Sequence, residues 1–218
     1  MKLYVIRHGE TVWNPQARLQ GKSDIPLNEK GLELARVTGQ SLLSVDFTAA
    51  YSSPLLRAYK TAEMTLGGRP IPIYKDDRLK EIGFGVWEGK SCRPGDHEIP
   101  EEDFSTFFND PFHFQPPQGG ERIQEVCKRA NEFMEEIIDK YKQGEDNILI
   151  STHGCTLRCL MNYFYKDNSK GIWRGNVPPN CAVTIVEIQG EQTKILEEDK
   201  IYYDTKEIKD YYAEGDEK

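Results

Sequence analysis

An arginine, a histidine and a glycine follow the first apolar run of the chain, in the stretch LYVIRHG at residues 3–9. Such a run predicts a buried strand, and Arg7 and His8 would then lie at its carboxyl end. A second apolar run, NILIST at residues 147–152, is followed directly by His153. The carboxyl ends of parallel strands share one edge of a sheet, where ligands bind, so we expect these side chains to meet there.

Two further charged residues are expected at the same edge. The run DFTAAYSS at residues 46–53 predicts another strand, and Arg57 comes one helical turn after it. Glu81 follows a short apolar run, IPIY, at residues 71–74. Two guanidinium groups match the geometry of a tetrahedral oxyanion, and the free amides of the helix after His153 would face the same place. The set therefore predicts a phosphate-binding site.

A neutral imidazole beside two arginines suits phosphoryl transfer. The cations offset the negative charge that repels a nucleophile from phosphorus, so His8 is a candidate nucleophile. The leaving oxygen needs a proton, which a carboxylic acid such as Glu81 can supply. Two histidines and a glutamate could also bind a catalytic metal, but the two arginines would repel a cation and attract phosphate. We therefore expect neither a metal nor another cofactor.

The segments that must position these residues alternate between strands and helices. Strands are expected at residues 2–6, 46–53, 71–74 and 147–152, followed by a hairpin formed by residues 182–188 and 193–198. Helices are expected from Asn28 to about Leu43, from a Ser53 cap and Pro54, over residues 121–142, and after His153. This alternation predicts an α/β three-layer sandwich, in which helices cover both faces of a mostly parallel central sheet.

Residues 83–119 interrupt this alternation. They contain five prolines and the acidic stretch HEIPEEDFSTFFND. We expect an inserted lid over one end of the sheet, within a single α/β domain that spans residues 1–218.

The composition disfavours several classes of function. The net charge of −8 argues against nucleic-acid binding, which needs a basic face. No window is apolar enough for a membrane span, and the five scattered cysteines are typical of reduced thiols in a cytoplasmic protein. We expect a cytoplasmic enzyme whose partner is a small-molecule phosphate ester, with no nucleic acid and no membrane. The oligomeric state stays open, with a homodimer as one alternative.

Six blocks of sequence resemble the histidine phosphatase superfamily, in its phosphoglycerate-mutase-like branch. The blocks are RHGETVWN (7–14), RLQGKSDIPLNEKG (18–31), SSPLLRAYKTAE (52–63), LKEIGFGVWEG (79–89), GGE (119–121) and STHG (151–154). They occur in the order of the family, and the resemblance extends from the N-terminus to about residue 190.

The resemblance implies a covalent mechanism that needs no metal. His8 would become a phosphohistidine, and Glu81 would act first as the general acid and then as the base that activates water. The phosphoryl oxygens would be bound by Arg7, Arg57 and His153. Further contacts with the phosphate or the substrate are expected from Asn14, Gln20, Gly21, Gly154 and Cys155, and from the lid residues Phe84, Trp87 and 104–114.

Departures from the mutase pattern favour a phosphatase. Mutases follow the acid with a Tyr-Gly-x-Leu-Gln-Gly-Leu-type stretch, whereas this chain has Phe84-Gly85-Val86-Trp87-Glu88-Gly89. Mutases also carry two arginines shortly before their proline cluster, where this chain has Phe112, His113, Phe114 and Gln115. An acidic, aromatic lid suits a monophosphate with a less charged body. Phosphoglycerate mutase-type transfer and a non-catalytic phosphate-binding module are the alternatives.

Overall fold

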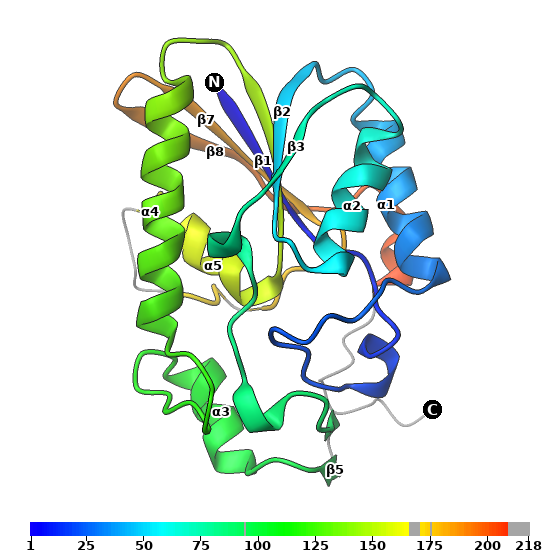
Figure 1. Ribbon diagram of the computed structural model, residues 1–218, viewed down its shortest axis with the longest axis vertical. Helices are drawn as coiled ribbons and strands as arrows, with labels where there is room; N and C mark the ends of the chain where they lie inside the picture. Colours follow the sequence, from blue (N-terminus) through cyan, green and yellow to red (C-terminus); the bar gives the residue numbers. More distant parts are fainter. Residues whose placement is uncertain (94, 166–170, 175, 209–218) are drawn as a thin grey trace.

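The computed structural model describes residues 1–93, 95–165, 171–174 and 176–208 of the chain (Figure 1). Its centre is a six-stranded sheet with the strand order β3-β2-β6-β1-β7-β8. The strands are β1 (Lys2–Arg7), β2 (Phe47–Ser52), β3 (Ile73–Lys75), β6 (Asn147–Thr152), β7 (Val183–Gln189) and β8 (Gln192–Lys200). Strands β3, β2, β6 and β1 run parallel, whereas β7 is antiparallel to both of its neighbours. The prediction of a mostly parallel sheet with a closing hairpin is confirmed.

Two pairs of helices cover the two faces of the sheet. The helices are α1 (Glu29–Ser41), α2 (Leu56–Leu66), α4 (Ile123–Tyr141) and α5 (Gly154–Asn162). Alternate residues of β1 enter different cores: Leu3 and Val5 join the core of α4 and α5, whereas Tyr4 and Ile6 join the core of α1 and α2. Burial on both faces explains why β1 is a continuous apolar run. Figure 1 shows the two helix pairs on opposite sides of the sheet, which confirms the three-layer prediction.

The register of the sheet brings the ends of three strands level with one another. Arg7 pairs with Thr152 between β1 and β6, and Ser52 pairs with Ser151 between β2 and β6. The segments that leave these strands therefore start at the same edge. The functional residues predicted for this edge lie in those segments.

Helix α1 begins as predicted, but α2 begins later. Asn28 caps α1, because its Oδ1 accepts a hydrogen bond from the Gly31 amide at 2.8 Å. Helix α2 begins at Leu56 and not at Ser53, whose Oγ is hydrogen-bonded to the ring of His153. The cap of α2 comes from a distant loop, since the Leu56 amide donates to Asp24 Oδ1 at 2.7 Å. The Ser-Pro signal was therefore wrong as a cap.

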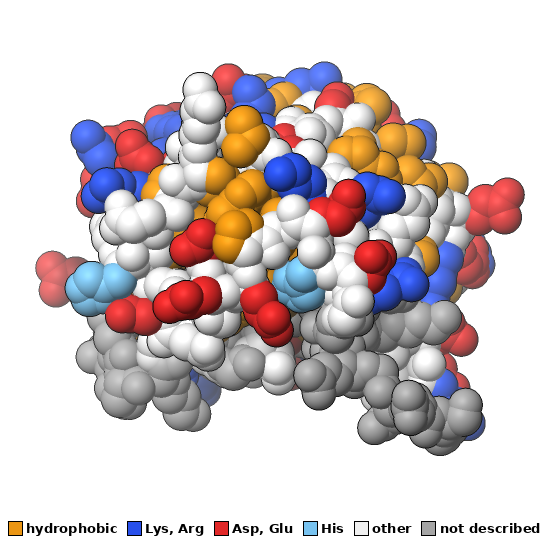
Figure 2. Space-filling view, turned by 90° about the horizontal axis from the view of Figure 1, so that it is seen from below, with side chains coloured by type: hydrophobic (Ala, Val, Ile, Leu, Met, Phe, Trp, Pro, Cys, Tyr) orange, Lys and Arg blue, Asp and Glu red, His pale blue; other side chains and the backbone are white. Residues whose placement is uncertain are grey.

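The described residues of the range 83–119 form the lid segment, which lies beyond the carboxyl ends of the parallel strands (Figure 1). The lid segment contains a 3₁₀ turn (Gly85–Trp87), the short strands β4 (Cys92–Arg93) and β5 (Asp96–His97), and helix α3 (Glu101–Asn109). Helix α3 was not predicted, although three acidic residues in its first turn favour a helix N-terminus. Figure 2 shows this end of the molecule, where acidic side chains border a central group of apolar ones.

No helix within the described residues has the length and apolar character needed to cross a bilayer.

Two glycines allow the loop after His8 to pack closely against the start of α1. A Cβ atom on Gly31 would lie 2.1 Å from the Glu10 carbonyl oxygen, and one on Gly9 would lie 2.6 Å from the Gly31 carbonyl oxygen. Asn28 adds a hydrogen bond from its Nδ2 to Glu10 Oε1 at 2.7 Å. This contact fixes the backbone that follows His8.

We predict that Gly31→Ala lowers the free energy of unfolding by about 2 kcal/mol, because the added methyl group would overlap the backbone of Glu10. Urea denaturation followed by circular dichroism measures this change. Gln40→Ala, at an exposed position of the same helix, is the control and should change the value by less than about 0.5 kcal/mol. Equal stability of the two variants would contradict the tight packing of this loop.

Candidate active site

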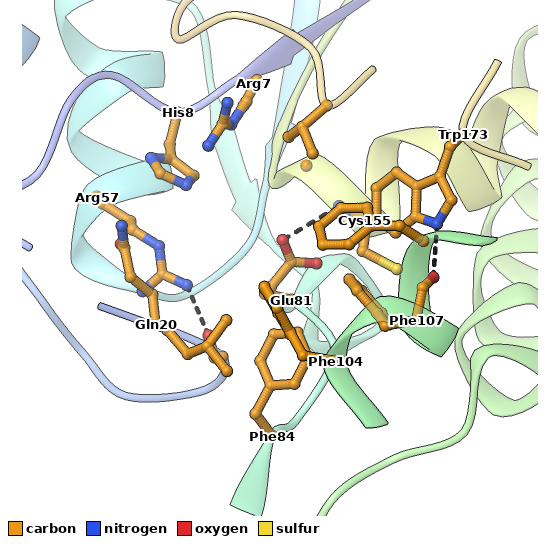
Figure 3. A pocket seen from close by; sticks show the side chains of 15 residues that line it. Arg7, His8, Gln20, Arg57, Glu81, Phe84, Phe104, Phe107, Cys155 and Trp173 are labelled. Atoms are coloured by element: carbon orange, nitrogen blue, oxygen red, sulfur yellow. Dashed lines mark hydrogen bonds between the residues drawn. The ribbon is translucent and has the colours of Figure 1, made fainter. Parts of the chain in front are cut away.

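A pocket lies between the carboxyl ends of the strands and the lid segment (Figure 3). It is lined by Arg7, His8, Leu19, Gln20, Gly21, Arg57, Glu81, Phe84, Phe104, Phe107, Phe108, Gly154, Cys155, Trp173 and Val177. Figure 3 shows that the two arginines and His8 gather on one side, whereas the aromatic rings lie on the other. The pocket therefore has a polar end and an apolar end.

His8 is buried at the polar end, in the loop that leaves β1. Its Nδ1 lies 2.7 Å from the Gly9 carbonyl oxygen. A carbonyl can only accept a hydrogen bond, so Nδ1 carries the proton and the neutral ring keeps a lone pair on Nε2. Burial, followed by the charges of Arg57 and Arg7, holds the pKa of His8 well below its ordinary value. The ring is therefore a neutral imidazole with a nucleophilic Nε2.

Arg57 is buried in the first turn of α2 and makes three hydrogen bonds. Its Nε donates to His153 Nδ1 at 3.1 Å, and its two terminal nitrogens donate to the carbonyl oxygens of Ser23 at 2.7 Å and Gly21 at 2.6 Å. Burial lowers the pKa of Arg57 to about 10, so the side chain keeps its charge at neutral pH. A guanidinium has five N–H groups, so two remain for a ligand.

His153 lies behind Arg57 and is not one of the residues that line the pocket. Its Nδ1 accepts from Arg57, so Nε2 carries the proton, and Nε2 lies 2.8 Å from Ser53 Oγ. Burial and the Arg57 charge hold the pKa of His153 well below its ordinary value. The rings of His153 and His8 lie 5.2 Å apart between centroids. His153 thus supports Arg57 in this arrangement, and its direct contact with phosphate stays a prediction.

Arg7 is the last residue of β1 and lines the pocket. Its Nη1 donates to the carbonyl oxygen of Pro178. Its Nε is buried and has no hydrogen-bond partner among the described residues. Leaving a buried donor unpaired is costly, and an anion in the pocket would supply the missing acceptor.

The Glu81 carboxylate lies at the polar end of the pocket, across from the two arginines and next to the first turn of α5. Its Oε2 accepts from the Cys155 amide at 3.2 Å, and its Oε1 accepts from the Thr156 amide at 3.1 Å. A Cβ atom on Gly154 would lie 3.8 Å from Glu81 Oε2 and 3.7 Å from Arg7 Nε, so both groups flank this glycine. The Cys155 amide, predicted to contact phosphate, is already bonded to Glu81 in this structure.

Three residues of the loop after β1 were expected to contact the ligand, and two of them line the pocket. Gln20 and Gly21 line the pocket, and the Gly21 carbonyl anchors Arg57. Asn14 does not line the pocket. Its Oδ1 accepts from the Thr11 amide at 2.9 Å and from Thr11 Oγ1 at 3.0 Å, so this side chain stabilises the turn.

Of the lid residues expected to contact the substrate, Phe84 lines the pocket, and so do Phe104, Phe107 and Phe108 from the range 104–114. Trp87 does not line the pocket, because its ring packs against Phe114, with 6.1 Å between the ring centroids. Trp173, which was not predicted, lines the pocket instead, and its Nε1 donates to the Phe107 carbonyl oxygen at 2.8 Å. A tryptophan within the polar stretch KDNSKGIWRGN is the signal that could have indicated it.

Within the described part of the chain, no group of three or more His, Cys, Asp or Glu side chains is placed to hold a metal ion. The polar end instead combines two cations, a neutral imidazole and a carboxylate. This combination can bind a phosphoryl group, attack it and exchange a proton with it.

Known proteins resemble the chain over nearly its whole length. The sequence model of the histidine phosphatase superfamily (branch 1) matches residues 3–199. Phosphoserine phosphatase 1 of Hydrogenobacter thermophilus is 32% identical over 196 residues, which are 90% of each chain. The 2,3-bisphosphoglycerate-dependent phosphoglycerate mutase 2 of Gloeobacter violaceus is 32% identical over 163 residues, which are 73% of each chain.

The solved structure of Bacillus stearothermophilus YhfR is similar to the fold, with a TM-score of 0.83 and 38% identity over 92% of this chain and 97% of that chain. The match to the family model includes all six motif blocks and every residue that lines the pocket. The chain therefore belongs to branch 1 of the histidine phosphatase superfamily, and the predicted phosphatase class is confirmed.

Proposed function

We propose that the protein is a metal-independent phosphomonoesterase that acts through a covalent phosphohistidine on His8. The observation that carries this proposal is the neutral, buried His8, whose free Nε2 shares a pocket with Arg7 and Arg57. Glu81 lines the same pocket and supplies the acid.

In the first step, the two arginines bind the phosphoryl oxygens and neutralise their charge. His8 Nε2 attacks phosphorus, so an N–P bond forms while the bond from phosphorus to the ester oxygen breaks. Glu81 transfers its proton to that oxygen, and the product is a neutral alcohol. The hydrogen bond from Nδ1 to the Gly9 carbonyl stabilises the positive charge that develops on the ring.

In the second step, water replaces the alcohol. Glu81, now a carboxylate, takes a proton from the water as its oxygen attacks phosphorus. The N–P bond breaks, its electron pair returns to Nε2, and inorganic phosphate leaves. His8 is again neutral, with its proton on Nδ1.

The apolar end of the pocket supports a substrate with an uncharged, apolar body. Four phenylalanines and a tryptophan line this end, namely Phe84, Phe104, Phe107, Phe108 and Trp173. Among the described lining residues, the cations are Arg7 and Arg57, both at the polar end. A second anionic group on the substrate would lose its hydration there without gaining a partner.

Two further cations near the lid segment, Arg93 and Arg174, have partners outside the pocket. Arg93 donates to the Pro15 carbonyl oxygen at 2.9 Å. Arg174 lies 3.6 Å from Glu198 and stacks on Tyr165 at 3.9 Å. These contacts favour hydrolysis of a monophosphate over phosphoglycerate mutase-type transfer, which uses a substrate with two acidic groups.

His8→Ala should reduce kcat at least about a thousandfold, because the variant lacks the group that accepts the phosphoryl group. Initial rates with a chromogenic aryl phosphate, in the presence of EDTA, measure this loss. His113→Ala is the control, since this exposed side chain is paired with Asp110 outside the pocket. Activity of His8→Ala above about one per cent of wild type would remove His8 as the nucleophile.

Glu81→Gln should lower kcat/KM about a hundredfold or more for an alkyl phosphate and less than about tenfold for a nitrophenyl phosphate. The reason is that an alkoxide must be protonated as it leaves, whereas a nitrophenolate leaves without this help. The ratio kcat/KM reports the formation of the phosphoenzyme and excludes the later attack by water. Equal losses for both esters would contradict the role of Glu81 as the acid.

The substrate class is tested by comparing 2-phenylethyl phosphate with 3-phosphoglycerate, because both are alkyl esters and their leaving groups are similar. We predict a kcat/KM at least about tenfold higher for the phenylethyl ester, because the aromatic end of the pocket gains a ring and no longer has to accommodate an unpaired carboxylate. Adding a trace of 2,3-bisphosphoglycerate to 3-phosphoglycerate should not cause the protein to convert 3-phosphoglycerate to 2-phosphoglycerate. Interconversion of phosphoglycerates faster than hydrolysis would favour the mutase alternative.

A further inference from the structure

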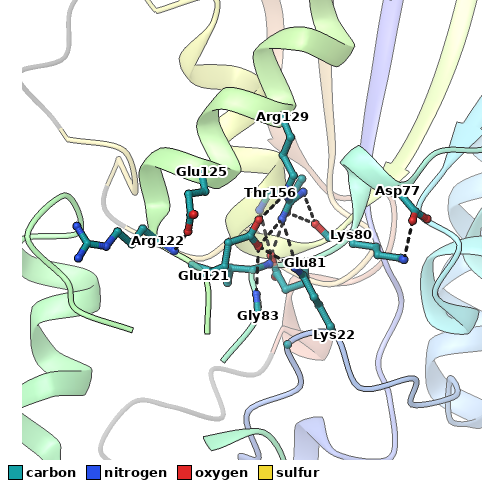
Figure 4. Close-up of polar contacts among 12 residues, drawn as sticks. Lys22, Asp77, Lys80, Glu81, Gly83, Glu121, Arg122, Glu125, Arg129 and Thr156 are labelled. Carbon is teal, nitrogen blue, oxygen red and sulfur yellow. Dashed lines mark hydrogen bonds and ion pairs between the residues drawn. The ribbon is translucent and has the colours of Figure 1, made fainter. Parts of the chain in front are cut away.

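An ion pair outside the pocket lies against the segment that carries Glu81 (Figure 4). Arg129 belongs to α4, and Glu121 lies just before the start of that helix. Arg129 Nε donates to Glu121 Oε1 at 2.9 Å, and Nη2 donates to Oε2 at 3.0 Å. The two side chains are only 15% and 14% exposed, so solvent screens this pair weakly.

The same guanidinium also binds the backbone of the acid and of the segment that precedes it. Arg129 Nη1 donates to the carbonyl oxygens of Arg78 and Lys80, each at 2.6 Å, and Nη2 donates to the Glu81 carbonyl oxygen at 3.3 Å. A planar, five-donor fork can make these bonds while it holds a carboxylate, whereas a lysine ammonium cannot. Arg129 therefore fixes the backbone from which Glu81 projects.

Glu121 connects this network to the loop that anchors Arg57. It accepts from the Gly83 amide at 3.3 Å and pairs with Lys22 Nζ at 3.3 Å. The neighbours of Lys22 in sequence, Gly21 and Ser23, provide the two carbonyl oxygens that hold Arg57. Burial opposes ionisation of Glu121, but the hydrogen bonds and charge of Arg129, with the charge of Lys22, lower the pKa of its carboxyl.

Glu81 depends on such support because it does not lie in a helix or strand. It follows the 3₁₀ turn Asp77–Leu79 and precedes the turn Gly85–Trp87. Its carboxylate accepts hydrogen bonds from the Ile82 amide and from two amides of α5, and its backbone is held by Arg129. A proton donor displaced by about 1 Å can lose much of its effect on the rate.

We propose that Arg129 and Glu121 are positioning residues, which hold Glu81 where it can protonate the leaving oxygen. Neither residue touches the substrate, since neither lines the pocket. This inference rests on the proposed phosphatase function and adds a requirement to it: the acid step depends on an ion pair anchored on α4.

The test compares kcat/KM of Arg129→Gln for the alkyl and the nitrophenyl phosphate. If the acid is displaced, kcat/KM should fall about tenfold or more for the alkyl ester and less than about threefold for the nitrophenyl ester. Glu121→Gln should show the same difference with smaller losses, because the neutral amide can still accept from Arg129. Adding Arg129→Gln to Glu81→Gln should cause little further loss for the alkyl ester, since the acid is already absent.

Arg78→Gln is the matched control. Arg78 lies in the same segment and also pairs with carboxylates, at 2.6 Å from Asp76 and 2.9 Å from Glu136. Its side chain makes no hydrogen bond to Glu81 or to Glu121 within the described structure. If this substitution only destabilises the protein, kcat/KM should change by the same factor for both esters.

Wild-type protein must first hydrolyse both esters. The inference is then overturned if Arg129→Gln and Glu121→Gln lower kcat/KM equally for the two esters, or leave it unchanged for both. If Arg129→Gln does not fold, Glu121→Gln decides the question by the same comparison. Wild-type protein that hydrolyses neither ester would instead refute the proposed phosphatase function, and the inference with it.

Discussion

The buried guanidinium of Arg57 is the group on which the rest of the site depends. Its three acceptors are His153, at the end of β6, and the carbonyl oxygens of Gly21 and Ser23. Burial of a cation is costly unless it is hydrogen-bonded, and the three bonds of Arg57 tie a strand end to the loop that follows β1. Burial, and after it the charge of Arg57, hold the pKa values of His8 and His153 well below their ordinary value, so both rings are neutral.

The neutral state of His8 connects this electrostatic arrangement to chemistry. A protonated imidazole has no lone pair and cannot attack phosphorus, whereas a neutral ring can attack through one nitrogen. The short contact of Nδ1 with the Gly9 carbonyl selects Nε2 as that nitrogen. The proposed reaction thus depends on two local features, burial beside cations and one backbone hydrogen bond.

The sequence predicted the features that arise from strand and helix periodicity. Arg7 and His8 could be placed because β1 is buried on both faces and must end where the sheet meets a ligand. Contacts between distant segments were not predictable: Asp24 caps α2, and Trp87 turns into the lid segment while Trp173 takes a place in the pocket. These outcomes depend on how loops pack, and a single sequence carries no periodic signal for loop packing.

The most direct test of the central claim is the chemical identity of the phosphoenzyme. Protein mixed with a nitrophenyl phosphate and quenched at alkaline pH, which preserves phosphohistidine, can be mapped by peptide mass spectrometry and assigned by ³¹P NMR. The structure predicts one phosphoryl group on Nε2 of His8, because Nδ1 is bonded to the Gly9 carbonyl. A phosphoryl group on Nδ1 or on another residue, or turnover without any phosphoenzyme in the quenched protein, would contradict the account.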